Sequence, residues 1–487
     1  MKKTHRNWIF LSCLGLASCS VGPEYVPPEL ASKTPDVWHF AVTDGFEIGT
    51  MDVSDWWYRF DDPQLVFLIS EAQQKNLSLK LAVSNVLQSR ATYGIASASV
   101  SPNISAKGQT EREQASDNSP TLANFPNVKA KPVNDFAVGL DASWEIDLWG
   151  GIEKNIEAAN AMEGVALEKY HDTLVTLRAE VAATYINIRV LQITKKLTTQ
   201  SIEVLQQLLV LVEAQFEQGV ISKSVLETER AMYDQNTTQL PAVEMQLVQE
   251  YARLAVLLDT DIQTIMHQLA DQLQVPRASP NVAVGIPAEV LRKRPDIREA
   301  ERALAAQTAL IGAKMANLYP KLSLSGAFGY EATETNDVIR WDSRTWSIGP
   351  SVSWDIFNGN RIRSQVQLQE EKANSAFLTW EQTVLRAFAE VEISLSNLIE
   401  SGKVQDAWND SSKSLLEALR LTEAEERLGV VQMQSVLNAK RNFINSQIML
   451  VEKTGAVSQN VVSLYKALGG DWESKDQTKV TQVRSTQ

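Results

Sequence analysis

The feature that most constrains this chain is a repeat of its own sequence. Residues 143–146 (Ser-Trp-Glu-Ile) return as 353–356 (Ser-Trp-Asp-Ile), and residues 218–220 (Gln-Gly-Val) return as 428–430 (Leu-Gly-Val). Both pairs are separated by the same offset of 210 residues (354 − 144 and 429 − 219). A constant offset across separated landmarks predicts two copies of one structural unit rather than unrelated domains. We expect the copies at 77–275 and 297–470, joined by a linker at 276–296.

The periodicity of apolar residues changes in the same order within each copy. A helical stretch comes first, at 77–99 and again at 297–318, and short runs of strict alternation follow it. The period then switches to that of a helix, with no proline before either Gly219 or Gly429. Such a helix of roughly 65–70 residues is about 100 Å long, which a globular domain does not need. The expected strands are 103–112, 135–148, 321–331 and 345–356; the long helices are 150–218 and 360–428; the return helices are 223–257 and 433–467.

The alternating runs have the length of strands that cross a bilayer at a tilt. One face of each run is apolar and aromatic, and the other is small, hydroxylated or acidic, although a soluble sandwich with one buried face shows the same local pattern. Four strands cannot close a barrel, and open edges in hydrocarbon leave peptide groups unpaired, so several chains must pool their strands. Three chains give twelve strands, enough for a wet lumen. The residues expected to line it are Asp141, Glu145, Asp147, Glu331 and Asp355.

The N-terminus has the pattern of a secretory signal. A basic start and a short apolar run predict a signal peptide at 1–18, too short to span a membrane. The Leu-Ala-Ser-Cys sequence that ends at Cys19 resembles the bacterial lipobox, which predicts acylation of Cys19 and a lipid-anchored segment at 19–76. The alternative is an ordinary signal peptide with an incidental cysteine. Ser20 follows Cys19 where an aspartate would indicate inner-membrane retention, so we expect attachment to outer-membrane lipid.

Composition argues against several other functions. The formal net charge is −13 and the cations are scattered, which disfavours a nucleic-acid partner. The four histidines are isolated, without metal-ligand spacing, and no catalytic or phosphate-binding motif is present. We therefore expect no enzyme activity, no metal and no cofactor. The tail at 471–487 is polar, and we expect it to be disordered.

Four further segments carry a resemblance to a known family. The sequence resembles the TolC/OprM family of outer-membrane efflux proteins, specifically its acylated, NodT-like branch. Four segments match motifs of that family and occur in the same order: 21–28, 56–65, 294–301 and 468–472. The resemblance implies an α+β membrane protein: a trimeric twelve-stranded β-barrel, a long periplasmic α-helical barrel and a mixed equatorial domain. It also implies a channel-tunnel in the outer membrane that passively conducts drugs or other small molecules. It further implies that the chain forms a homotrimer. The implied partner proteins are a periplasmic adaptor and an inner-membrane pump of the RND type.

The resemblance assigns a role to the two hairpin tips. Gly219, Val220, Gly429 and Val430 match the family's tip motif, where adaptor hairpins dock. Glycine has an independent reason there, since a helix reversal commonly needs a positive φ. A turn without any docking role is thus an equal alternative.

The resemblance also places a periplasmic gate beyond the second tip. Asn438 stands where the family usually carries an aspartate, so the hydrogen-bonding capacity is kept and the charge is lost. Arg441 matches a family arginine and is expected to pair with Glu227 or Glu229. The alternative for each of these charges is a solvated helix face.

Two other functional classes share parts of this pattern. An outlet for type I protein secretion or metal export has the same architecture, although the tips are poor in histidine and methionine. A periplasmic scaffold with no conduction is the alternative from a different class.

Overall fold

The computed structural model is mostly helical, with one small sheet, and divides into two compact units. Unit 1 comprises residues 1–27, 87–165 and 300–379, and unit 2 comprises residues 28–86, 166–299 and 380–487. The structure describes residues 20–30, 35, 37–40, 55–117, 130–270, 274–278 and 287–470. The expected signal peptide at 1–18, Cys19 and the tail at 471–487 lie outside the described residues.

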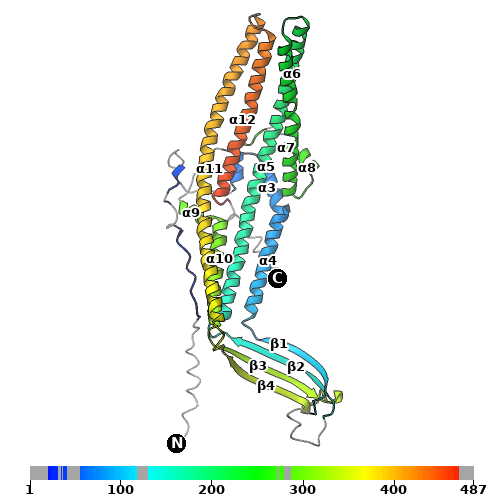
Figure 1. Ribbon diagram of the computed structural model, residues 1–487, viewed down its shortest axis with the longest axis vertical. Helices are drawn as coiled ribbons and strands as arrows, with labels where there is room; N and C mark the ends of the chain where they lie inside the picture. Colours follow the sequence, from blue (N-terminus) through cyan, green and yellow to red (C-terminus); the bar gives the residue numbers. More distant parts are fainter. Residues whose placement is uncertain are drawn as a thin grey trace. The chain divides into compact units, whose positions relative to one another are not determined.

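Unit 1 contains the sheet. Strands β1 (Asn103–Glu113), β2 (Val133–Ile146), β3 (Lys321–Ala332) and β4 (Arg344–Ser353) pair antiparallel in the order β1-β2-β3-β4 (Figure 1). Side chains alternate between the two faces of a strand, and directly paired residues share a face. The alternating sequence therefore produces one largely polar face and one largely apolar face. β2 and β4 end two and three residues before the positions expected from the sequence.

Three indole groups connect the sheet to the helices of unit 1. Helix α4 (Leu77–Ala98) leads into β1 and helix α10 (Pro295–Ala316) leads into β3. The carbonyl groups that follow such helix ends have no partner in the helix and need a donor. The indole N–H of Trp144 donates to the Val100 carbonyl at 2.8 Å, and that of Trp354 donates to the Leu318 carbonyl at 3.0 Å. The third, from Trp149, donates to the Pro320 carbonyl at 2.8 Å.

Unit 2 contains the hairpins in which the two long helices end, while residues 151–165 and 361–379 of these helices belong to unit 1. Helix α5 (Gly151–Glu217) is followed by α6 (Lys223–Thr237) and α7 (Gln239–Leu257), while α11 (Arg361–Arg427) is followed by α12 (Met433–Ala467). Apolar residues at helical spacing on α5, α6 and α12 pack into one core, which holds these helices together. Its buried members are Leu197, Val204, Leu208, Val212, Leu226, Leu437 and Ile444.

The first return helix is broken, which corrects the continuous helix expected at 223–257. α6 ends at Thr237 and α7 begins at Gln239. Pro241 explains the break, because proline has no N–H to donate and its ring clashes with the carbonyl four residues earlier. α12 contains no proline and is continuous over 433–467. The expected linker at 276–296 includes a short helix, α9 (Pro287–Lys293), and α10 already begins at Pro295.

Smaller elements of unit 2 pack through aromatic and capping contacts. The 3-10 helix η2 (Trp56–Phe60) stacks Trp56 on Tyr465 of α12, with ring centroids 5.4 Å apart. Asp62 caps α3 (Pro63–Lys75) by accepting two backbone N–H groups, and it also accepts the Tyr185 hydroxyl at 2.8 Å. Helix α8 (Ile262–Gln268) completes the described elements of this region. None of the described helices carries an apolar stretch long enough to cross a membrane.

Candidate functional site

The polar face of the sheet gathers three of the five carboxylates expected to line a lumen. Asp141 pairs with Ala327, Glu145 with Ser323, and Glu331 with Ala137, so all three side chains share a face. Lys107 forms an ion pair with Asp141, and the Lys321 ammonium lies 3.4 Å from the Glu145 carboxylate. No cation among the described residues pairs with Glu331. Two of the three charges are thus compensated on the face itself.

The other two carboxylates, Asp147 and Asp355, lie beyond the strands, in corresponding turns. The Leu148 N–H donates to the Ile146 carbonyl at 2.9 Å, and the Ile356 N–H donates to the Trp354 carbonyl at 3.1 Å. Each bond closes a three-residue turn with the aspartate at its centre, which ends the strand. Asp147 then accepts the backbone N–H of Glu153 at 2.8 Å, near the start of α5, and Asp355 pairs with Arg361 at 3.0 Å.

The opposite face of the sheet is apolar, and no other described part of the chain covers it. Large side chains from all four strands stay exposed, to 71% for Ile348 and 68% for Trp346. A soluble monomer rarely leaves so large a contiguous apolar surface in water. The exposed members are Ile104, Val138, Leu140, Trp144, Phe328, Trp346, Ile348 and Val352.

Both edges of this sheet are also open within one chain. β1 pairs only with β2, and β4 pairs only with β3, among the described residues. Each therefore has one side whose N–H and C=O groups have no strand partner, which makes it a template for another strand. The sheet is thus incomplete in two directions.

The two hairpin tips share one backbone geometry. Gly219 has φ +70° and Gly429 has φ +74°. The Gly219 N–H donates to the Phe216 carbonyl and the Val220 N–H to the Gln215 carbonyl, both at 2.9 Å, and the second tip repeats the pair of bonds. This is a Schellman motif, which ends a helix with one residue in the left-handed region. It leaves Val220 and Val430 exposed to 66% and 70%, one on each tip.

The residues of the expected gate do not form the expected ion pair. The Arg441 guanidinium contacts the Met232 sulfur at 3.7 Å, whereas Glu227 lies 3.8 Å from Arg230. One carboxylate oxygen of Glu229 is buried and has no partner among the described residues. The Asn438 side chain is half-buried and makes no hydrogen bond to any residue that the structure describes. Among the described residues, the expected pairing of Arg441 with Glu227 or Glu229 is absent.

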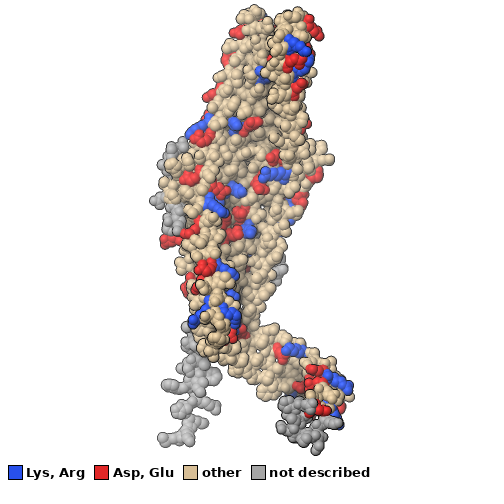
Figure 2. All heavy atoms as spheres, in the orientation of Figure 1, with Lys and Arg blue, Asp and Glu red and all other residues tan. Residues whose placement is uncertain are grey.

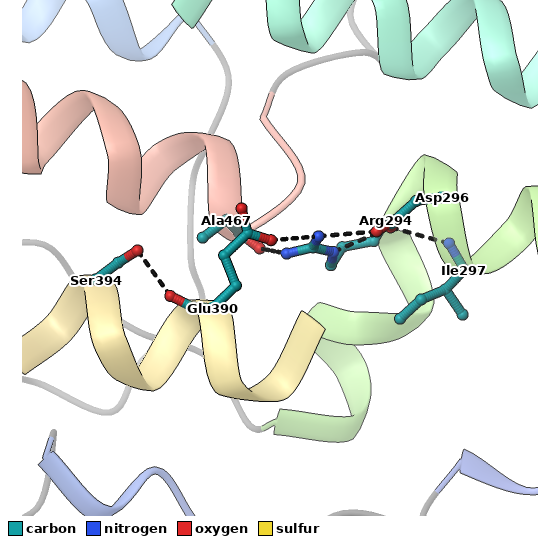
Figure 3. Close-up of polar contacts among 6 residues, drawn as sticks. All are labelled: Arg294, Asp296, Ile297, Glu390, Ser394 and Ala467. Carbon is teal, nitrogen blue, oxygen red and sulfur yellow. Dashed lines mark hydrogen bonds and ion pairs between the residues drawn. The ribbon is translucent and has the colours of Figure 1, made fainter. Parts of the chain in front are cut away.

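A buried arginine links three helices of unit 2 (Figure 3). Arg294 is 8% exposed, and its guanidinium lies 2.8 Å from Asp296 and 2.7 Å from Glu390 of α11. It also donates to the carbonyl of Ala467, the last residue of α12. The guanidinium fork satisfies two carboxylates and a helix-terminal carbonyl at once. Arg294, in the 294–301 segment, therefore connects the start of α10 to α11 and to the end of α12.

Carboxyl groups near Arg294 have perturbed acidities. Burial raises the pKa of Asp172 above its ordinary value, and the nearby Asp296 carboxylate adds to the rise. Burial also raises the pKa of Glu299, against the opposing charge of Lys169. Loss of water around a carboxylate disfavours its charged form, which is the common cause.

Comparison with known proteins identifies the family. The sequence matches the family described as outer membrane efflux protein over residues 68–260 and 286–470. The chain belongs to the outer membrane efflux protein family. This outer membrane efflux protein is 28% identical to the pyoverdine export outer membrane protein OpmQ of Pseudomonas aeruginosa, over 96% of this chain and 97% of that protein. It is 28% identical to nodulation protein T of Rhizobium leguminosarum, over 93% of this chain and 91% of that protein.

Solved structures agree with this assignment. The outer-membrane channel OprN superposes with a TM-score of 0.82 at 25% identity, covering 93% of this chain and all of that chain. The CmeC outer membrane channel of Campylobacter jejuni, at 23% identity, shares the fold with a TM-score of 0.86, over 96% and 98% of the two chains. The expectation of an efflux channel of the outer membrane is confirmed, and the family is one of channels rather than enzymes.

Sequence reasoning missed several features of this efflux protein. It did not pair Lys107 with Asp141 or Lys321 with Glu145, although both lysines alternate onto the polar face. The break at Pro241 was also absent from the expected elements, although the proline itself is a signal that the sequence carries. Along the helices in the view of Figure 2, both signs of charge are interspersed.

Proposed function

We propose that three copies of this chain form the outlet of a tripartite efflux system in the outer membrane. In this proposal the three sheets join into one twelve-stranded barrel, and the hairpins of α5–α7 and α11–α12 form a periplasmic tunnel. The observation that carries the proposal is the sheet itself, which has two unpaired edges and an exposed apolar face. The repeat of 210 residues then reflects two similar halves in each protomer.

The physics of the bilayer supports joining the strands of several chains. Hydrocarbon offers no partner for the peptide groups of β1 and β4, each costing several kcal/mol when unpaired. Edge pairing between chains satisfies these groups, and lipid covers Ile348, Trp346 and their neighbours. Eight strands from two chains would fill their interior with side chains, whereas twelve leave room for water. The polar face with Asp141, Glu145 and Glu331 then lines the lumen.

The remaining assignments follow from the family resemblance. Cys19 carries the lipid anchor, and a periplasmic adaptor docks at Gly219, Val220, Gly429 and Val430. The adaptor connects the tunnel to an inner-membrane pump of the RND type, as the resemblance implies. The pump supplies the energy, so conduction through the tunnel is passive. Exposed valines on both tips offer the adaptor an apolar contact.

Reconstitution in planar bilayers tests the proposal. The purified mature protein should give discrete, stable conductance steps, because a water-filled lumen carries ions. A scaffold without a pore would give none, and that result would overturn the outlet. The same protein heated to unfold before addition is the matched control.

A second candidate is the outlet of a type I secretion or metal-export system. One relative, 26% identical over 95% of this chain, is the cation efflux system protein CusC of Escherichia coli. A deletion strain distinguishes the candidates. Sensitivity to hydrophobic drugs with normal protein secretion and metal tolerance favours the drug outlet, whereas the reverse favours the second candidate.

Asn438 allows a direct test of the gate. Asn438→Asp restores a negative charge close to Arg441 on the same helix, and we expect it to change the basal conductance in bilayers. Gln434→Glu, one turn earlier on α12, is the control for an added charge. Equal conductance for Asn438→Asp and the unmodified protein would remove Asn438 from the gate.

A further inference from the structure

The first residues after Cys19 lie against the backbone of unit 1. The Val21 N–H donates to the carbonyl of Trp149, in the link between β2 and α5, at 3.0 Å. Gly22 has φ +113°, and a Cβ built on it would lie 2.4 Å from the Cα of Gly312 in α10. Only glycine allows two backbones to approach this closely. The segment is therefore packed against the helix and does not merely pass over it.

Two further glycines form the other side of this contact. A Cβ on Gly312 would lie 2.7 Å from the Val21 carbonyl oxygen. Gly150 has φ +73°, and a Cβ there would lie 2.6 Å from the Ser20 hydroxyl oxygen. Each distance is shorter than any ordinary carbon contact, so a side chain at either position would displace residues 20–22.

The surface against which residues 20–22 pack is itself fixed by side-chain contacts. Besides its indole bond to Pro320, Trp149 stacks on Tyr319 with ring centroids 4.7 Å apart. Lys154 lies 8% exposed beneath Gly312, and its ammonium pairs with Glu157 at 2.7 Å. The β2–α5 link and the α10–β3 turn therefore hold each other in place and form one continuous surface.

We propose that Gly22, Gly150 and Gly312 form a socket that fixes where the N-terminal acyl group enters the membrane. The inference rests on the proposed acylation of Cys19. Cys19 directly precedes Ser20, and consecutive Cα atoms are about 3.8 Å apart, so holding Ser20 restricts where the lipid is attached. The partner is the phospholipid surface of the periplasmic leaflet, met at the level of the Trp149–Tyr319 pair. Aromatic rings of this kind favour the membrane interface.

A fixed attachment point has a physical advantage over a loose tether. One acylated residue anchors a chain only modestly, so a second attachment must act together with it. Two linked attachments reinforce each other most when the link is short and holds both at matching positions. The socket places the acyl group beside the strands, which form the second attachment.

Limited proteolysis of the mature acylated protein in detergent tests the socket. Glu24 is exposed within the segment, and a glutamate-specific protease that cuts after it releases residues 19–24. Gly312→Ala should speed this cleavage by about tenfold or more, because cleavage requires the segment to leave its place. The control is Gly94→Ala, also in a helix of unit 1, where open space surrounds the new Cβ.

Gly22→Ala provides a second variant that changes no helix or strand. It should speed the cleavage as Gly312→Ala does, since it acts on the same contact from the other side. Cleavage at equal rates in all four proteins would overturn the socket. The mass of the released peptide tests acylation separately: a peptide without acyl chains would reject the lipid anchor, whereas an acylated peptide with unchanged rates would reject the socket alone.

Discussion

Gly219 and Gly429 are required by their backbone conformation alone. Both have positive φ, and a Cβ at either position would meet nothing within 4 Å. Alanine at either tip should therefore cost about 1–2 kcal/mol, the penalty of the left-handed region for other residues. Hydrogen exchange of the tip amides should rise in Gly219→Ala and Gly429→Ala. Gly402→Ala, in the middle of α11 with equal space, should instead slow exchange locally, and similar behaviour of all three would contradict this explanation.

Asp172 is expected to make stability depend on pH. Its pKa is raised in the folded protein, so its contribution is fully present below the ordinary pKa of about 4 and is lost as pH rises through the raised value. Asp172→Asn should raise the thermal unfolding temperature near pH 8 and change it little near pH 4. Asp410→Asn, on an exposed helix face, should have no effect at either pH. An unchanged or lower unfolding temperature for Asp172→Asn near pH 8 would refute the prediction.

At the scale of elements, Arg294 holds α10 to α11 and to the end of α12 (Figure 3). Arg294→Met leaves Asp296, Glu390 and the Ala467 carbonyl without their partner. We expect a loss of about 3 kcal/mol in the free energy of unfolding, because breaking a buried ion pair strands its other members. Arg230→Met removes exposed ion pairs with Glu213 and Glu227 and should lower the free energy of unfolding far less, because water screens exposed charges. Thermal unfolding in detergent compares the two, and equal losses would show that Arg294 has no special role.

At the scale of the whole molecule, the open edges of the sheet predict how copies join. Ser105→Cys on β1, combined in turn with cysteines at Thr345, Ser347 and Ser351 on β4, should give disulfides between chains and a covalent species of three chains. Ser143→Cys with Ser325→Cys is the control, since these residues face each other inside one chain. It should form a disulfide and stay at the mass of one chain on a denaturing gel. Species that stop at two chains would overturn the threefold barrel.

Much of the fold could be predicted from local signals. Alternation places Asp141, Glu145 and Glu331 on one face without knowledge of the partner strands, because the period of a strand is two. The glycines at the two tips can also be predicted from the sequence, since a helix reversal commonly needs a positive φ. Pro241 is a local signal too, and the proline alone is enough to predict the break at Thr238.

What the sequence by itself determined, then, is the order of helices and strands, the two faces of the sheet and the two tips, all of which depend on periods and on glycine. The tertiary structure alone decided which charges meet and which glycines are crowded. Arg441 contacts Met232 instead of a glutamate, and Gly22 meets Gly312 from 290 positions away (312 − 22). Such contacts depend on how distant segments pack, and neither partner's own neighbours in the sequence carry any trace of the other.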